Sequence, residues 1–424
     1  MPEKIIRDPV HDVIAFRLDR PADALLFRLI NAAEFQRLRR IRQLGMASLA
    51  YPGADHSRYS HSLGVMQTAR MMLEQLRHSV KIDDGEETVC LAACLLHDLG
   101  HGPFSHVFER VSGVSHEGIT RRVILDDKSD VHRTLVTHDP ALPSLVVELL
   151  EGRAARPFFC DVLASQLDAD RFDYLLRDNL MTGSRYGSYD LVWLLHALTV
   201  HAGSGHLAVT WKGVSAVEAY LQSRYHMYRN VYFHKVVRSA EGMVKLALQR
   251  AKRLAVQGRL AWPPAESVVH RALMGRSVST EEFVDLDDIS MLHCFKVWQS
   301  SDDPALARLC RGLLFRRVYK TIDLTHLDGA EVARHAGGAA DAVAKAGGDP
   351  AYDLFYDEPS EAGYEPNAKE PCGDPEIAVL RPDGSLTTFA HVSPLTEALN
   401  RQLMFRRLHV AAEWRDVAAS ALRE

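Results

Sequence analysis

The segment from Leu95 to His106, which reads Leu-Leu-His-Asp-Leu-Gly-His-Gly-Pro-Phe-Ser-His, constrains the fold more than any other. An apolar run, Val89 to Leu96, comes directly before its histidines and predicts a buried helix that ends near His97 and Asp98. Neighbouring helical side chains point about 100° apart, so both can reach one metal ion only at a helix end. The glycines and the proline that follow favour such an end. Histidines that merely complement a helix dipole are the simpler alternative, but three histidines and an aspartate within ten residues favour a metal site.

Two distant segments supply further candidate ligands. Ser60 is the expected N-cap of a helix, which would hold His61 at the helix mouth. Asp170 lies in an expected helix together with Asp173, Tyr174 and Arg177, at spacings of three, four and seven residues. These polar residues share one helix face, which is either exposed to solvent or forms the wall of a site. Together with His97 and Asp98, these residues make a set of two imidazoles and two carboxylates.

This donor set predicts one site for a divalent metal ion and hydrolytic chemistry around it. The set leaves positions open on a six-coordinate ion and suits Mn²⁺, Fe or Mg²⁺ better than structural zinc, with Zn²⁺ as a further candidate. Such an ion lowers the pKa of a bound water and polarises a phosphoryl oxygen. His101 and His116 are then candidates for general acid or base work near the ion, and Glu109 is a candidate for orienting one of these imidazoles.

Length and composition indicate a globular protein with one large domain and an appendage. The chain has 424 residues, 47% of them hydrophobic and 25% charged, which is too long for one small core. The net charge of −5 argues against a general nucleic-acid coat. The six cysteines form no CxxC pair, there is no run of about 18 apolar residues, and the N-terminus has no signal-peptide pattern. We therefore expect a cytoplasmic protein without a membrane span.

The hydrophobic periodicity predicts a mainly α fold, with a helical core over residues 1–325 and a small α+β appendage over residues 326–424. In the core we expect a short strand or hairpin over Lys4–Phe16, a helix over Pro21–Gly45, and a long helix over Ser215–Leu254 that is broken near Asn230. Further along we expect a strand over Leu314–Ile322, a helix over Asp328–Asp349, a loop over Tyr352–Pro375, a hairpin over Ile377–Phe389, a helix over Leu395–Met404, a strand over Phe405–Ala411 and a last helix.

Several motifs together resemble a known family. His61-Ser-Leu-Gly-Val is followed by His97-Asp-Leu-Gly-His-Gly-Pro-Phe-Ser-His and Asp168-x-Asp-Arg-Phe-Asp-Tyr-Leu-x-Arg-Asp, while Asp8-Pro-Val-His and Phe35-Gln-Arg-Leu stand earlier in the chain. The sequence is similar to the HD-domain phosphohydrolases and, within them, to the deoxynucleoside triphosphate triphosphohydrolases (dNTPases). The resemblance covers about the first 320 residues and is strong through Asp178. It implies a metal-dependent enzyme that acts on dNTPs.

The resemblance assigns roles position by position. It implies that the metal ligands are His61, His97, Asp98 and Asp170, with room for a further Mg²⁺ bound with the triphosphate. His101 and His116 match histidines that act around the α-phosphate. The positions that hold triphosphate oxygens are matched by Arg58, Arg171 and Arg224. Those that face the sugar and base are matched by Tyr174, Asp178 and Tyr232, with Gln43 and Leu44 nearby. An aromatic ring packed against the sugar would exclude a 2′-hydroxyl.

Two departures from the family pattern and one arginine-rich segment bear on regulation and assembly. Arg171 replaces the lysine that relatives often carry, so one phosphate contact differs. Asn31-Ala32-Ala33 replaces the acidic residue and proline of activated relatives, which argues against guanine-nucleotide activation at this position. The arginines between Arg28 and Arg42, the loosely joined appendage and the resemblance together predict a homo-oligomer, either a dimer or a tetramer.

Three functions are compatible with these residues. The leading one is metal-dependent hydrolysis of a dNTP to the deoxynucleoside and inorganic triphosphate. A phosphodiesterase or nuclease that acts on single-stranded nucleic acid would use the same metal site, but the acidic net charge disfavours it. A nucleotide-sensing module without turnover is the third, and its expected mark, the loss of a metal ligand or a catalytic histidine, is absent from the sequence.

Overall fold

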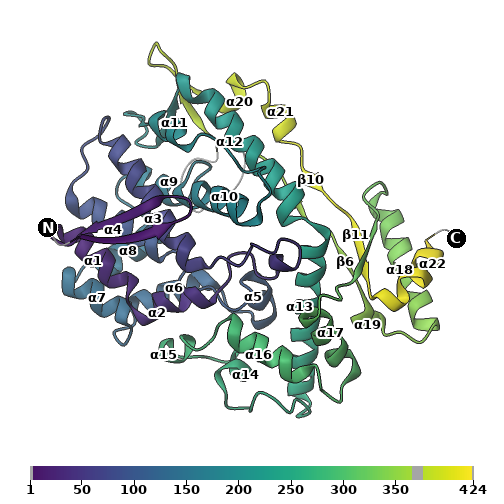
Figure 1. The fold of residues 1–424 in the computed structure, drawn as a ribbon. Coiled ribbons are helices and arrows are strands. Elements are labelled where there is room, and N and C mark those ends of the chain that lie inside the picture. The colour runs from purple at the N-terminus through teal and green to yellow at the C-terminus, as the bar shows by residue number, and fades with distance from the viewer. Residues whose placement is uncertain (1–2, 365–375, 423–424) are drawn as a thin grey trace.

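The computed structural model describes residues 3–364 and 376–422, and this part of the protein is mainly α-helical (Figure 1), as predicted. The larger part begins with the hairpin β1 (Glu3–Asp8) and β2 (Asp12–Arg17), which confirms the expected hairpin. Its helices are α1 (Pro21–Ile30), α2 (Ala33–Arg37), α3 (Arg58–Leu76), α4 (Asp84–Leu96), α5 (His106–Ser112), α6 (His116–Leu125), α7 (Asp130–His138), α8 (Leu142–Leu150), α9 (Pro157–Leu163), α10 (Ala169–Thr182), α11 (Leu191–His196), α12 (Val214–Met227), α13 (Lys235–Val256), α14 (Val268–Leu273), α15 (Thr280–Phe283), α16 (Asp288–Trp298) and α17 (Pro304–Leu314).

Helix α4 forms the centre of the core, between α3 and α8. It begins at a capping box, in which the Asp83 carboxylate accepts from the Glu86 N–H and the Glu86 carboxylate accepts from the Asp83 N–H. Every residue from Cys90 to Leu96 is buried, so apolar packing on all sides holds the helix. The helix ends at His97, where the sequence predicted its end. Helix α3 packs against both α4 and α10, and these three helices carry the site described below.

Three expectations in the core need comment. The predicted helix over Pro21–Gly45 is wrong, because α1 ends where the Asn31 side-chain amide donates to the carbonyl oxygen of Phe27, and the short α2 follows. The predicted N-cap at Ser60 is also wrong, because α3 begins after Ser57 and the Ser60 hydroxyl donates to the Ser57 carbonyl oxygen at 2.7 Å. The predicted break near Asn230 is confirmed, since a π-helical turn over Tyr228–Tyr232 separates α12 from α13.

The C-terminal part mixes helices and strands, as predicted. Its elements are β5 (Lys320–Asp323), α18 (Gly329–Lys345), α19 (Pro350–Asp353), β6 (Leu354–Asp357), β7 (Ser360–Glu361), β8 (Ala378–Leu380), β9 (Leu386–Thr388), α20 (Phe389–Val392), α21 (Thr396–Leu399), β10 (Leu403–Met404), β11 (Arg407–Val410) and α22 (Arg415–Ala421). The helix over Asp328–Asp349, the hairpin of β8 and β9, the strand near the C-terminus and the last helix are confirmed.

Other C-terminal expectations differ from the structure. Of the strand expected over Leu314–Ile322, only the part in β5 is a strand. Leu314 is instead the last residue of helix α17, which begins after its N-cap residue Asp303. The segment expected as a loop contains α19, β6 and β7, and its residues 365–375 lie outside the described part. The helix expected from Leu395 is only α21, because β10 then pairs with β7.

Of two small sheets, one lies within the C-terminal part and the other joins that part to the rest of the chain. Strand β11 pairs antiparallel with both β5 and β6, and this sheet packs with α18 and α22 around a second apolar core. Strand β8 pairs parallel with β4 (Leu207–Thr210), which itself pairs with β3 (Leu198–Val200). Figure 1 shows β6, β10 and β11 running beside α12 and α13. The domain boundary at residue 325 stays a prediction.

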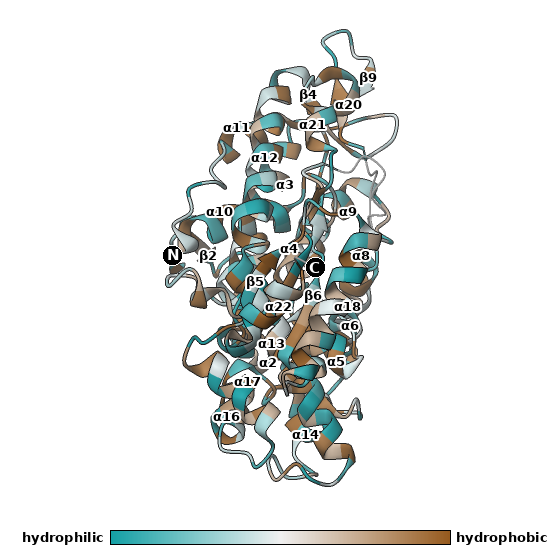
Figure 2. Ribbon diagram, turned by 90° about the vertical axis from the view of Figure 1, so that its right-hand side faces the viewer, coloured by the Kyte–Doolittle hydropathy of each residue, from teal (hydrophilic) through white to brown (hydrophobic). Residues whose placement is uncertain are grey.

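Packing follows the amphipathic pattern of the helices, most of which carry both hydrophilic and hydrophobic residues (Figure 2). Among the described residues, no helix is long and apolar enough to cross a membrane. The described cysteines are buried free thiols rather than disulfides or a metal site, and Cys372 lies outside the described residues.

Candidate metal centre

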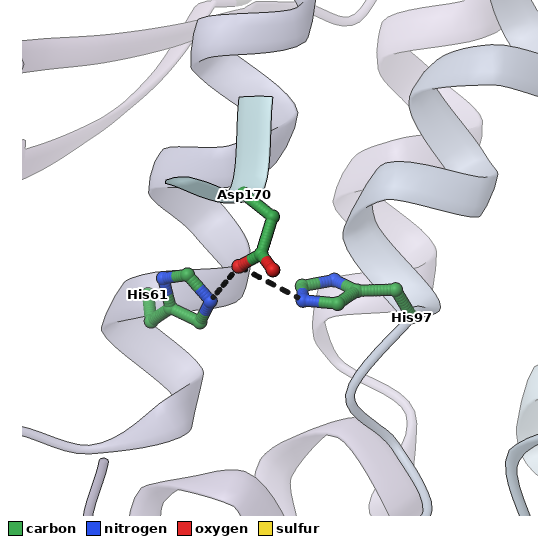
Figure 3. Close-up of side chains that lie close together, drawn as sticks. All are labelled: His61, His97 and Asp170. Carbon is green, nitrogen blue, oxygen red and sulfur yellow. Dashed lines mark ion pairs between the residues drawn. The ribbon is translucent and has the colours of Figure 1, made fainter. Parts of the chain in front are cut away.

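The cluster at the centre of the molecule joins one residue from each of α3, α10 and the end of α4. His61 Nε2 lies 2.9 Å from Asp170 Oδ1, and His97 Nε2 lies 3.7 Å from the same oxygen. One donor atom from each of the three residues lies within 4.8 Å of the other two. Figure 3 shows the two imidazole rings on either side of the carboxylate, with their Nε2 atoms directed at it. The sequence predicted all three residues as ligands of one ion.

The far side of each imidazole is held by a hydrogen-bond acceptor, as metal-binding histidines require. His97 Nδ1 lies 2.8 Å from the carbonyl oxygen of Cys94, and His61 Nδ1 lies 2.9 Å from Asp173 Oδ2. Because a carbonyl oxygen only accepts, His97 Nδ1 carries a proton. Its Nε2 is a buried atom without a hydrogen-bond partner in the described part of the chain. These atoms therefore fit a divalent ion, which would take the Nε2 lone pairs.

Electrostatics keeps the carboxylates charged. Burial opposes the charge on Asp170, but the His61 imidazole at 2.9 Å and the His97 imidazole at 3.7 Å hold the pKa of this carboxyl well below its usual range. Burial lowers the pKa of His61, and the carboxylates of Asp170 and Asp173 outweigh it and raise that pKa to about 10. An ion bound by His61 Nε2 would therefore have to displace a proton from this imidazole.

Asp98, the fourth predicted ligand, lies beside the cluster and also contacts two other side chains. Its oxygens are 3.4 Å from His97 Nε2 and 3.8 Å from His61 Nε2. The same carboxylate pairs with Arg58 and lies 3.1 Å from His101 Nε2. Burial works against its charge, but Arg58, His97 and His101 hold the pKa of Asp98 well below its usual range. The carboxylate is within reach of the ion site, and its place among the ligands stays a prediction.

The predicted catalytic residues form a chain next to the cluster. His101 and His116 stack with ring centroids 4.1 Å apart and ring planes 21° apart. His116 Nδ1 lies 3.0 Å from Glu109 Oε2, and the backbone N–H of His116 donates to the other oxygen of Glu109. Burial and the neighbouring Arg58 charge hold the pKa of His101 well below its usual value, so this imidazole is neutral at neutral pH. The structure thus places Glu109 where it fixes one tautomer of His116.

Two cavities meet at this site. The first, of about 670 Å³, is lined by the three cluster residues and by Asp98, His101 and His116. The second, of about 350 Å³, is lined by Leu44, Asp178 and Tyr232 among others. Gln43, Arg58 and Tyr174 line both cavities, so they form the wall that the two share.

Two arginines that were predicted to bind phosphate are engaged by other groups of the protein in this structure. Arg171 pairs with Asp168 and donates to the carbonyl oxygen of Ser165. Arg224 is buried and pairs with Glu361 at 2.8 Å. Neither arginine lines the two cavities.

A buried ion network behind His61 received no role in the sequence analysis. Asp173 accepts from Arg177 Nε at 2.8 Å, and its other oxygen lies 2.8 Å from His11 Nε2. Arg177 also pairs with Asp8 at 2.8 Å. The spacing of four residues between Asp173 and Arg177 was the available signal, and it predicted only a shared face. The network holds the ring of His61 in place.

The loop between α4 and α5 carries a second unpredicted feature. Phe104 and Ser105 both have φ of 52°, in the left-handed region that residues other than glycine rarely adopt. The backbone N–H of Phe104 donates to Asp288 Oδ1 at 2.8 Å, and the Ser105 hydroxyl accepts from Arg58 Nε at 3.1 Å. Asp288 at the start of α16 therefore holds the loop that places Ser105 against the site.

Gly64 gives a direct test of the network behind His61. A Cβ at this position would lie 1.8 Å from Asp173 Oδ1 and 2.3 Å from Arg177 Nη2. Because Gly64→Ala must break this buried pair, we expect the free energy of unfolding to fall by about 3–5 kcal/mol in urea denaturation. In the control Gly337→Ala, the new Cβ meets open space on helix α18, and the same substitution should stabilise by about 0.5–1 kcal/mol. A Gly64→Ala protein as stable as the wild type would contradict the close packing of Asp173.

The fold and the cluster define a helical protein built around a His–Asp site that fits a divalent metal ion. Comparisons with known proteins give the family. The HD domain matches residues 58–140, and the HD associated region matches residues 190–259. The uncharacterized protein YwfO of Bacillus subtilis is 36% identical over 403 residues, which cover 94% of this chain and 89% of that protein. The chain belongs to the HD-domain phosphohydrolases, as its motifs predicted.

A solved structure and a named enzyme extend this finding. The structure of a phosphohydrolase from Bacteroides thetaiotaomicron has a TM-score of 0.82 and 30% sequence identity, and covers 96% of this chain and 100% of that one. A protein of Dictyostelium discoideum named deoxynucleoside triphosphate triphosphohydrolase SAMHD1 homolog is 28% identical over 355 residues. That alignment covers 80% of this chain and 64% of the Dictyostelium protein, so this chain spans less than two thirds of that relative.

Proposed function

We propose that the protein hydrolyses deoxynucleoside triphosphates to the deoxynucleoside and inorganic triphosphate. The observation that carries this proposal is that two cavities of different character meet at Gln43, Arg58 and Tyr174. One contains the His–Asp cluster and the paired histidines, which suit a phosphate chain. The other is lined mainly by aromatic and apolar side chains, which suit a sugar and a base, together with two further arginines and a glutamate at its wall. The resemblance to proteins named as dNTPases supports the same substrate.

At the phosphate end, Arg58 is the cation best placed for the substrate. It lines both cavities, and its guanidinium is oriented by Asp98 and by the Ser105 hydroxyl at 3.1 Å. A divalent ion held by His61, His97 and Asp170 would supply a Lewis acid and an activated water. Arg58 would neutralise the negative charge on the phosphate oxygens while the bond to the deoxynucleoside breaks, which is the usual task of arginine in phosphoryl transfer.

At the nucleoside end, a hydrogen-bonded pair and two aromatic rings shape the cavity. The Tyr232 hydroxyl donates to Asp178 Oδ2 at 2.8 Å, and His56 Nε2 lies 2.8 Å from the other oxygen of Asp178. The rings of Tyr174 and Tyr232 lie 6.3 Å apart, nearly perpendicular to one another. We propose that these rings pack against the deoxyribose and leave no room for a 2′-hydroxyl.

The stacked histidines complete the proposed reaction. Because Nδ1 of His116 lies 3.0 Å from Glu109 Oε2, we propose Nε2 of His116 as the atom that exchanges a proton with the substrate. We propose that the Glu109–His116 pair gives a proton to the 5′-oxygen of the departing deoxynucleoside. Hydrolysis then breaks the bond between this oxygen and the α-phosphorus, and the water oxygen remains in the triphosphate.

Product analysis tests the proposed function. Metal-loaded protein is incubated with each of the four dNTPs and, in parallel, with the matching ribonucleotides, and products are resolved by ³¹P NMR and chromatography. We expect a deoxynucleoside and tripolyphosphate from at least one dNTP, far slower turnover of the ribonucleotides, and no product after chelation of the metal. Release of pyrophosphate, or cleavage of oligonucleotides alone, would contradict the proposal and favour a phosphodiesterase.

A further inference from the structure

The C-terminal segment places a carboxylate on an arginine of the core, next to the substrate cavities. Glu361 Oε1 in strand β7 lies 2.8 Å from Arg224 Nη2 in helix α12. Four residues earlier, Asp357 in β6 accepts from Arg238 Nε at 3.0 Å in helix α13. Arg238 lines the second cavity. The segment from Asp357 to Glu361 therefore supplies carboxylate partners for one arginine on α12 and one on α13.

Arg224 lies directly behind the cavity wall. Its guanidinium carbon lies 5.7 Å from the ring centroid of Tyr228, which lines the second cavity, and its charge acts on Tyr174, which lines both. Arg171 and Tyr220 also lie close enough to act on its charge. Only one side-chain layer thus separates Arg224 from the space proposed for the substrate.

The hydrogen bonding of Arg224 is incomplete. The side chain is 5% exposed. Nη1 donates to Gln166 Oε1 at 3.1 Å and Nη2 donates to Glu361, but Nε has no partner among the described residues. A buried donor without a partner lowers the stability of the folded chain. A phosphate oxygen would satisfy it, since a guanidinium binds phosphate through two adjacent N–H groups.

The strand that carries Glu361 is fixed to the core. Glu361 pairs with Leu403 of β10, and the backbone N–H of Tyr364 donates to the Leu399 carbonyl oxygen at 3.2 Å. Tyr364 is fully buried against Phe389. The carboxylate therefore occupies a built position and is not a chance surface contact.

We propose that Glu361 competes with polyphosphate for Arg224, so that an incoming phosphate chain must displace this carboxylate before Arg224 can bind it. The inference rests on the proposed function for its substrate, a nucleoside triphosphate. As a consequence, the protein with the Glu361–Arg224 pair intact binds polyphosphate more weakly than the same protein with Arg224 released from Glu361. Any movement of β7 away from α12 releases Arg224 and strengthens that binding.

Calorimetric titration of magnesium tripolyphosphate into the metal-loaded full-length chain tests this competition. In Glu361→Gln the amide keeps the size of the side chain without the charge, and we expect the dissociation constant to fall about tenfold. In an Arg224→Gln background the same change should have less than a twofold effect, because the competing pair is already broken. Glu397→Gln is the matched control, since Glu397 lies in the same C-terminal part, is exposed, and pairs with the exposed Arg401 at 3.5 Å.

The outcomes separate this inference from the proposed function. Unchanged or weaker tripolyphosphate binding in Glu361→Gln would overturn it, as would equal tightening with and without Arg224. Absence of tripolyphosphate binding by every variant would overturn it as well. Tighter binding in a protein that turns over no dNTP would sustain the inference and overturn the proposed function. Turnover of dNTPs together with unaltered tripolyphosphate binding in Glu361→Gln would sustain the proposed function and overturn the inference.

Discussion

The His97→Ala protein is expected to lose its bound metal and to lose turnover by roughly 10³-fold or more, while it keeps its helical fold. His97 sits at the end of α4 with its Nε2 buried and directed at the cluster, so alanine removes a ligand without disturbing the apolar face of the helix. Metal content is measured by mass spectrometry of the purified protein, and the fold by circular dichroism. His78→Ala is the control, because His78 is exposed and lies at the far end of α3 from the cluster.

The same experiment decides the role of Asp98. Its carboxylate lies 3.4 Å from His97 Nε2 but also pairs with Arg58. If Asp98 is a ligand, Asp98→Ala abolishes stoichiometric metal as His97→Ala does. Full metal content in Asp98→Ala would remove this residue from the ligand set, whereas full metal content in His97→Ala would overturn the site as a whole.

The His116→Ala protein is expected to bind metal and dNTP normally but to lose about 10²–10⁴-fold in kcat, the usual scale of acid–base catalysis. His116 stacks on His101 and lines the cavity, yet it is not among the cluster residues within reach of the ion. Steady-state kinetics at saturating dNTP and metal analysis of the same sample separate chemistry from binding.

Glu109→Gln is the companion variant to His116→Ala. The amide keeps an oxygen near His116 Nδ1 but lacks the charge that stabilises a protonated imidazole, so we expect a smaller loss in kcat, about 10–100-fold. A wild-type kcat in His116→Ala at saturating dNTP would show that His116 takes no part in catalysis. It would not affect the assignment of the metal ligands.

The sequence predicted the metal centre because its signals are local. An apolar run followed by His97-Asp98 and a Gly-Pro stretch fixes a helix end, and the structure has that end at His97. The capping residue before α18, Asp328, also marks its own helix, and this start was predicted. His61 and Asp170 were chosen from their local patterns and from the family resemblance of the motifs around them.

Features that depend on contacts between distant segments could not be predicted. Nothing near Arg224 in the sequence indicates that Glu361, 137 residues later, is its partner. Likewise, the hydrogen bond from the Phe104 N–H to Asp288 joins residues 184 positions apart. Such pairs are set by tertiary packing, and single-residue patterns do not encode them. The homo-oligomer expected from the sequence also depends on surfaces between chains and stays a prediction.

Hydrolysis in ¹⁸O-labelled water tests the central claim most directly. Metal-loaded protein is incubated with a dNTP in this solvent, the products are separated, and the mass of each product is measured by mass spectrometry. The account predicts one ¹⁸O atom in the tripolyphosphate and none in the deoxynucleoside, because water attacks the α-phosphorus beside the His61–His97–Asp170 cluster. Label in the deoxynucleoside, release of pyrophosphate, or undiminished turnover by the His97→Ala protein would contradict it.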